Sequence, residues 1–177
     1  MKSLNHFSIP IQGLKDGMHQ FDFQVDKAFF ANFENSQIED GNFDVNLYFD
    51  KRPDMYIMTF SYEGSVQTAC DRCLVDIKLP LKGDNQLMVK FAEVPSEEAE
   101  VIYIIRGMNE LNVAKYVYEF ISLAIPILKV YDCENDDPPP CNNEMLGYLN
   151  QTNQEQKEEG NSSNPIWDTL KDLDNTN

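Results

Sequence analysis

Much of the first hundred residues alternates between apolar and polar side chains. Phe21, Phe23 and Val25 alternate with polar neighbours, and the stretch from Phe43 to Phe49 repeats the pattern. A period of two residues is typical of a strand with one buried and one exposed face. Further strand-like runs follow at residues 55–62, 65–70, 75–81, 86–91 and 101–106. We expect a hairpin loop at Lys51–Asp54, a turn or kink at Glu63-Gly64, and a connection at Gly83-Asp84.

The pattern changes to helical spacing after residue 108. Asn109 suits a helix N-cap and Glu110 suits a first turn, while Pro126 ends a helix. Apolar residues recur between them every three or four positions: Val113, Val117, Phe120, Ile121 and Ala124. We predict one main helix over Glu110–Ala124, packed on the sheet through this stripe. The fold class is therefore α+β, with an antiparallel sheet of about six or seven strands, or a partial barrel, carrying one main helix.

Composition divides the chain near residue 149. Residues 1–149 read as the α+β domain, and residues 150–164 contain no apolar side chain, which predicts a disordered acidic linker. In residues 165–177, Trp167, Leu170 and Leu173 follow helical spacing. A short amphipathic segment beyond a linker predicts an element that docks on a partner. The alternative is that this segment folds back and caps its own domain.

The chain is strongly acidic, with 30 Asp and Glu against 14 Lys and Arg and a net charge of −16. Such a chain is repelled by nucleic-acid phosphates and is better suited to a basic partner protein. Direct RNA contact would require the basic side chains to gather in one patch: Arg72, Lys78, Lys82 and Lys90.

The four cysteines form two pairs, Cys70 with Cys73 and Cys133 with Cys141. Zinc prefers four tetrahedral thiolate or imidazole ligands, and a two-residue gap lets both sulfurs of one turn reach one ion. We therefore expect the four cysteines to bind one structural zinc ion, which would join the middle of the domain to its end. Buried thiols, a disulfide and a redox-active pair remain as alternatives.

Several features limit the cellular setting and the chemistry. The start of the chain lacks the apolar run of a secretory signal and no stretch is long enough to span a membrane, so we expect a cytoplasmic protein in which stable disulfides are rare. His6 and His19 have no neighbouring nucleophile, and no phosphate-binding glycine motif is present. We therefore expect no enzymatic activity.

Two motifs resemble those of the YceD-like family of large ribosomal RNA subunit accumulation proteins. The first is the Gly64-x-Val-x-Thr-x-Cys-x-Arg-Cys-Leu74 knuckle, and the second is the later helix that ends in Leu-x-Ile-Pro. The terminal Pro165-x-Trp-x-x-Leu-Lys-x-Leu173 is also similar to the family's version. One departure is Cys133, where relatives often carry His, and either residue can bind zinc.

The resemblance implies a non-enzymatic factor that supports large-subunit ribosomal RNA accumulation and ribosome assembly. It supplies no catalytic residues. Acidity favours binding to a basic ribosomal protein or assembly intermediate, with Arg72 and the Trp167, Leu170 and Leu173 segment as candidate contacts. The alternative function is a zinc-binding or thiol-redox protein unrelated to ribosomes.

Overall fold

The computed structural model describes residues 4–131 and 141–148. The chain divides into two compact units, which we describe separately. The first, here called the sheet body, comprises Met1–Ala69 and Asp76–Tyr131. The second, here called the cysteine unit, comprises Cys70–Val75 and Asp132–Asn177. The predicted linker and the terminal segment lie outside the described residues, so the domain limit at residue 149 stays a prediction.

The sheet body contains eight strands and two α-helices among its described residues. They occur in the order η1 (Leu4–Phe7), β1 (Ser8–Ile9), η2 (Ile11–Gly13), β2 (Gly17–Val25), α1 (Lys27–Phe30), β3 (Gly41–Lys51), β4 (Met55–Ala69), β5 (Asp76–Phe91), β6 (Ser96–Glu97), β7 (Val101–Ile104), β8 (Leu111–Asn112) and α2 (Ala114–Ala124).

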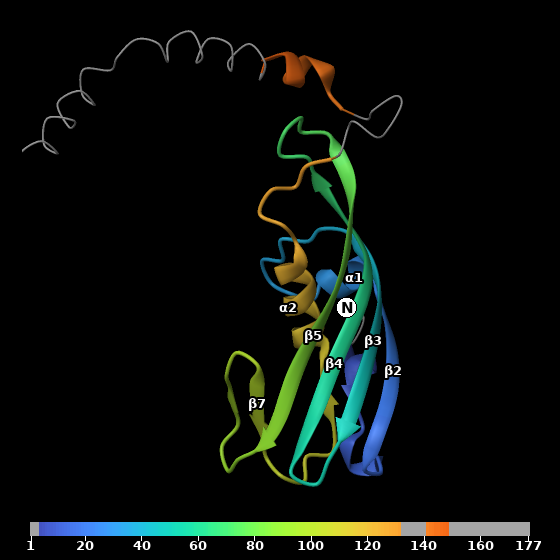
Figure 1. The fold of residues 1–177 in the computed structure, drawn as a ribbon, viewed down its shortest axis with the longest axis vertical. Helices are drawn as coiled ribbons and strands as arrows, with labels where there is room; N and C mark the ends of the chain where they lie inside the picture. The colour runs from blue at the N-terminus through green and yellow to red at the C-terminus, as the bar shows by residue number, and fades with distance from the viewer. Residues whose placement is uncertain (1–3, 132–140, 149–177) are drawn as a thin grey trace, which may run out of the picture. The chain divides into compact units, whose positions relative to one another are not determined.

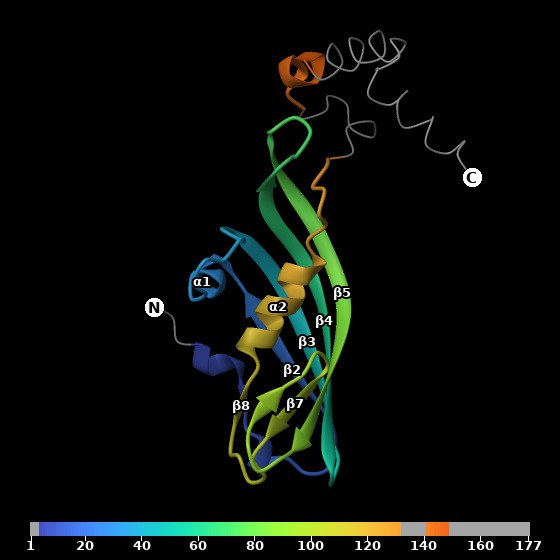
Figure 2. The same cartoon turned by 90° about the vertical axis from the view of Figure 1, so that its left-hand side faces the viewer.

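Six strands form the main sheet, in the order β2-β3-β4-β5-β7-β6, and β1 pairs with β8 in a separate two-stranded sheet. Figure 1 shows β2 to β5 as long, twisted neighbouring strands. Figure 2 shows α1 and α2 on the same side of these strands. The predicted α+β class with one main helix is confirmed. The expectation of a wholly antiparallel sheet is wrong at one pair, because β7 runs parallel to β5.

The predicted alternation places one face of the long strands in the core. Leu47 of β3 lies opposite Phe60 of β4, and both side chains are fully buried. From α2, Val117 and Ile121 belong to the same core cluster, as the helical stripe predicted. Burying one side chain of this size contributes about 1.5–3 kcal/mol, so this core is the main source of stability of the body.

The breaks between strands expected at Gly64 and Gly83 are wrong, because both glycines lie inside continuous strands. A Cβ on Gly64 would stand 2.1 Å from the backbone oxygen of Asn42, so the strands can approach here only because glycine has none. A Cβ on Gly83 would stand 2.5 Å from the hydroxyl oxygen of Tyr62. Here glycine marks close packing inside a sheet rather than the end of a strand.

The predicted helix start is also wrong by several residues. Leu111 and Asn112 form β8, with Leu111 opposite Ile9 of β1, and α2 begins only at Ala114. The side-chain oxygen of Asn112 accepts a hydrogen bond from the backbone N–H of Ala114 at 3.0 Å. Asn109, the predicted cap, therefore lies before β8, because pairing with the N-terminal strand outweighs local helix propensity.

Candidate functional site

The hexapeptide Cys70–Val75, here called the knuckle, connects the ends of β4 and β5. Its ends are tied by a hydrogen bond from the backbone N–H of Cys70 to the carbonyl oxygen of Val75, at 2.8 Å. A second bond runs from the N–H of Leu74 to the carbonyl oxygen of Cys70, at 2.9 Å. Leu74 has a φ of 60°, a left-handed conformation that costs a non-glycine residue about 1 kcal/mol or more. The knuckle is thus a tight turn that holds a strained residue.

The knuckle separates its side chains sharply by exposure. Cys70 and Cys73 are fully buried, whereas Leu74 is 63% exposed. Asp71 and Arg72 are exposed as well. Arg72, a predicted partner contact, is therefore accessible, although nothing in the structure assigns it a partner.

The third described cysteine, Cys141, is nearly buried and precedes a helical run over residues 143–148. The side-chain oxygen of Asn142 caps that run by accepting hydrogen bonds from the N–H groups of Glu144 and Met145, at 3.1 and 3.3 Å. Cys141 is disulfide-bonded, which matches one of the alternatives that the sequence left open. Cys133 lies outside the described residues, as do Trp167, Leu170 and Leu173.

The structure therefore describes three of the four predicted zinc ligands, Cys70, Cys73 and Cys141. No group of three or more His, Cys, Asp or Glu able to hold a metal occurs within residues 4–131 and 141–148. None of the three described cysteines belongs to the main hydrophobic core cluster. The two knuckle cysteines fit half of a tetrahedral thiolate site, and Cys141 would fit it only in its reduced form.

An acidic hollow lies at the end of the sheet body where β4 ends and β5 begins. It has a volume of about 460 Å³ and is lined by Lys27, Gln37, Glu39, Asp40, Gln67, Thr68, Ala69 and Asp76. Lys27 stands 3.7 Å from the Asp40 carboxylate, whereas Glu39 and Asp76 have no basic partner among the described residues. Two such carboxylates with nearby amide groups can accept the ammonium or guanidinium group of a basic side chain. No sequence motif signalled this hollow, because its residues come from four separate segments: α1, the loop before β3, the end of β4 and the start of β5.

The β5 lysines do not form one basic patch. Lys78, Lys82 and Lys90 are all exposed on the same face of the strand, but Asp76 and Asp84 share that face. At about 3.3 Å per residue, Lys90 is about 40 Å from Lys78 along the strand. Lys82 lies opposite Glu63 of β4, which offsets its charge. Direct RNA contact was expected to require one patch of basic side chains. These three lysines do not form such a patch.

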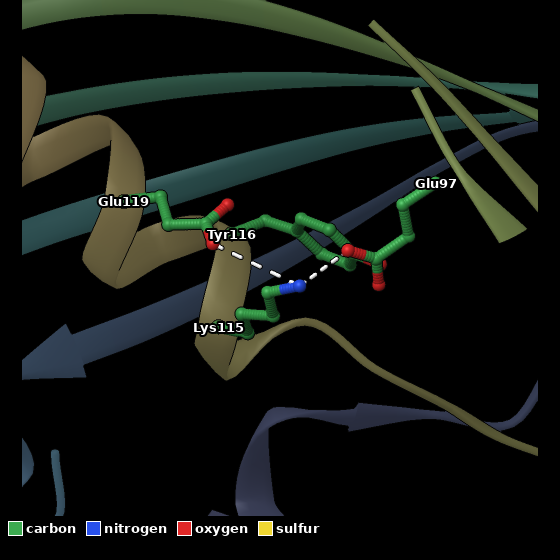
Figure 3. Close-up of polar contacts among 4 residues, drawn as sticks. All are labelled: Glu97, Lys115, Tyr116 and Glu119. Atoms are coloured by element: carbon green, nitrogen blue, oxygen red, sulfur yellow. Dashed lines mark hydrogen bonds and ion pairs between the residues drawn. The ribbon is translucent and has the colours of Figure 1, made fainter. Parts of the chain in front are cut away.

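Figure 3 shows a cluster of polar residues that sequence reasoning missed. Lys115 of α2 forms an ion pair with Glu97 of β6 and lies 3.8 Å from Glu119, one turn further along the helix. The hydroxyl of Tyr116 donates a hydrogen bond to the other carboxylate oxygen of Glu97, at 3.1 Å. The cluster ties α2 to β6, and residues 18 positions apart gave no local signal of it.

The pKa values in this cluster favour fixed protonation states over proton transfer. The hydrogen bond from Lys115 lowers the pKa of Glu97, and the same bond raises the pKa of Lys115. Burial, together with the Glu97 charge, raises the pKa of Tyr116 far above its ordinary value. The phenol is therefore a protonated hydrogen-bond donor at neutral pH. This arrangement serves as a structural clasp, hereafter the Glu97 clasp.

The fold and knuckle define a small α+β protein that places a cysteine-bearing turn between its two longest strands. The model of one protein family, described as "Large ribosomal RNA subunit accumulation protein YceD", matches residues 58–174. The chain belongs to the YceD family. Neither a curated protein nor a solved structure matches it. The matched residues include most of β4, the knuckle, β5 and α2, so the family signature covers the knuckle and both strands that carry it.

Membership indicates a role in the accumulation of large-subunit ribosomal RNA, as the family's description states. Within the described residues, no helix has the length and apolar character needed to cross a membrane.

Proposed function

We propose that this protein supports large-subunit ribosomal RNA accumulation without catalysis, by binding a basic ribosomal protein or assembly intermediate. Family membership supports the role in ribosomal RNA accumulation. The net charge of −16 supports a contact with a basic surface. The observation that carries the proposal is the acidic hollow, in which Glu39 and Asp76 have no basic partner among the described residues. Ribonucleoprotein assembly in the cytoplasm is the setting that we expect.

Electrostatics favours a protein partner over RNA. Residues 1–131 carry 19 acidic and 12 basic side chains, and the rest carries 11 acidic and 2 basic ones. Both parts repel phosphate and attract Lys-rich or Arg-rich surfaces, which accelerates association at low salt. The three β5 lysines are spread along their strand, so they offer no concentrated site for an RNA backbone.

Charge reversal in the hollow tests this proposal. Full-length protein carrying Glu39→Lys and Asp76→Lys should capture less ribosomal protein from a lysate than wild type, with the same melting temperature. Asp54→Lys combined with Glu93→Lys is the matched control, because it makes the same change in net charge at exposed positions outside the hollow. Equal losses for both double variants would show that only total charge matters. Unchanged capture by the hollow variant would refute the hollow as the contact.

We propose as a second function that the cysteines hold a structural zinc ion. Cys70, Cys73, Cys133 and Cys141 would be its ligands, and zinc would supply folding energy to the cysteine unit. The support is a tight knuckle with two fully buried sulfurs outside the main core cluster. Metal analysis of protein purified under reducing conditions, paired with a thiol titration, tests it. One zinc per chain with masked thiols is the expected result, and four titratable thiols without metal would refute it.

A further inference from the structure

Most of β5 has a neighbouring strand on one side only. β4 pairs with it from Asp76 to Lys90, whereas β7 pairs only with Met88–Phe91. No other described strand pairs with residues 76–87 on the β7 side. Figure 2 shows β5 along the right-hand edge of the sheet, with β7 beside its lower part. We call the unpaired backbone edge of residues 76–86 the β5 edge.

The orientation of the β5 edge follows from one hydrogen bond. The backbone N–H of Met88 donates to the carbonyl oxygen of Glu100 at 2.8 Å, on the β7 side. Backbone groups of a strand point alternately to its two sides, so those of Lys78, Lys82, Asp84 and Gln86 point to the same side as those of Met88. The backbone groups of Pro80 point to this side as well. Its lack of an N–H therefore removes no hydrogen bond between β5 and β4. Proline in a strand is found where its nitrogen faces an unpaired edge.

We propose that the β5 edge pairs antiparallel with the β5 edge of a second copy of this chain. The edge runs from Asp76 to Gln86, the last residue before Met88 whose backbone groups point away from β4, and only one antiparallel register uses its full length. That register places Asp76 opposite Gln86, Lys78 opposite Asp84, and Pro80 opposite Lys82 of the second copy. Two Lys78–Asp84 pairs then form across the twofold axis, both on the exposed face.

The other face of the strand fits the same register. Leu81 then lies opposite Leu81 of the second copy, at the twofold axis, in a pair whose side chains approach closely. Shifting the register by two residues one way opposes Lys78 with Lys82, and shifting it the other way opposes Lys82 with itself. Like charges directly opposite each other destabilise strand pairing. The register with full overlap is thus also the register with complementary charges.

An open edge of this length would otherwise invite unspecific strand pairing. The two lysines limit that pairing, because a basic or misregistered strand brings like charge against Lys78 or Lys82. Pro80 lacks an N–H in every register, so in the proposed dimer the Lys82 carbonyl oxygen of each copy receives no hydrogen bond from residue 80 of the other. A second copy is the occupant that supplies an acid opposite each Lys78. The product is one continuous sheet that joins β5 of both copies.

Analytical ultracentrifugation of the full-length protein over a range of concentrations tests the proposal. Wild type should dimerise reversibly. In a Lys78→Glu homodimer, Glu at position 78 faces Asp84 of the other copy. In an Asp84→Lys homodimer, Lys78 faces a second lysine. Either variant alone should therefore raise the dimer dissociation constant about tenfold or more. An equimolar mixture of the two variants should form a heterodimer. In it, the acid at position 78 of one variant faces the base at position 84 of the other, and the second pair across the axis keeps its native Lys78 and Asp84.

Lys90→Glu and Asp54→Lys are the matched controls, since both positions are exposed and lie outside the β5 edge. Each should dimerise like wild type. A second readout is amide exchange, in which the N–H groups of Lys82 and Asp84 should be protected at dimer concentrations and exchange rapidly on dilution. A wild-type chain that stays monomeric, a dimer insensitive to Lys78→Glu, or a variant mixture that stays monomeric would each overturn the proposal.

Discussion

The sheet body and the knuckle bury their side chains in different ways. In the body, burial follows a long alternating pattern, so that Phe43, Val45, Leu47 and Phe49 of one strand all contribute to one core cluster. In the knuckle, two sulfurs are buried within four residues, next to the exposed Arg72 and Leu74. Neither sulfur belongs to the core cluster.

The difference shows which region can fold from hydrophobic burial alone. A body with several fully buried aromatic side chains gains enough from removing apolar surface from water. A six-residue turn has no such reserve, and it also holds Leu74 in a strained conformation. The knuckle therefore has little apolar burial of its own to hold it, and its two cysteines are reduced thiols, whereas the body is held by its core.

Gly64→Ala should have the largest effect, and it should act on the body. Its Cβ would overlap the Asn42 backbone oxygen and the Phe43 side chain, and backbone atoms within a sheet cannot move aside cheaply. We expect a loss of about 3 kcal/mol in the free energy of unfolding, measured by urea denaturation. Gly13→Ala is the control, because a Cβ there meets nothing within 4 Å. Equal effects from the two changes would contradict the close-packing account.

Cys70→Ser should separate metal binding from packing in the knuckle. If the knuckle binds zinc, Cys70→Ser and Cys70→Ala should both abolish metal binding and destabilise the protein by about 2 kcal/mol. If Cys70 only fills space, Cys70→Ala should be much milder than Cys70→Ser, because alanine leaves no buried hydroxyl unsatisfied. Zinc content and thermal unfolding of the two variants decide between these outcomes.

Trp167→Ala should affect binding and leave stability nearly unchanged. Trp167 lies outside the described residues, and its role as a docking anchor is a prediction from its spacing with Leu170 and Leu173. Loss of an aromatic anchor typically weakens binding by about 2 kcal/mol. The measurement is capture of ribosomal precursors alongside a thermal melt. A melting temperature lowered by several degrees with capture intact would show instead that the segment caps its own domain.

The Glu97 clasp should contribute least, and its contribution should depend on pH. Because the folded state lowers the pKa of Glu97, its stabilisation is present above the ordinary glutamate pKa of 4.5 and is lost as the pH falls through the folded value. The side chains are about half exposed, so screening limits the effect to less than about 1 kcal/mol. Glu97→Gln should therefore lower the free energy of unfolding at pH 7 but not at pH 3. An equal loss at both values would contradict an ionic role.

Sequence periodicity predicted the parts of the fold in which one strand or helix face is buried. It identified the alternating residues of β2 and β3 and the apolar stripe of α2 because each pattern lies within one segment. It misread Gly64 and Gly83, since a glycine needed for close approach looks like a glycine at a turn. It also missed β8, where pairing with distant Ile9 decides the conformation.

The candidate site shows the same division. The Cys70 and Cys73 pair was visible from spacing, because both residues lie in one turn. The acidic hollow was not, since Glu39 lies in the loop before β3 and meets Gln67 of β4 and Asp76 of β5 only in the folded sheet. The Glu97 clasp likewise depends on how β6 meets α2. Local sequence patterns therefore indicated the knuckle, whereas the acidic hollow and the Glu97 clasp form only when distant segments pack together.

We propose that the protein contacts a basic protein rather than RNA, and ribonuclease treatment separates these two kinds of partner. The most direct measurement captures ribosomal precursors on the full-length protein, divides the sample, treats one half with ribonuclease, and identifies proteins and RNA in both. We predict that basic ribosomal proteins remain bound after ribonuclease and are released as salt is raised, because screened charge carries the contact. Loss of every ribosomal protein on ribonuclease treatment, with large-subunit RNA bound beforehand, would contradict the claim.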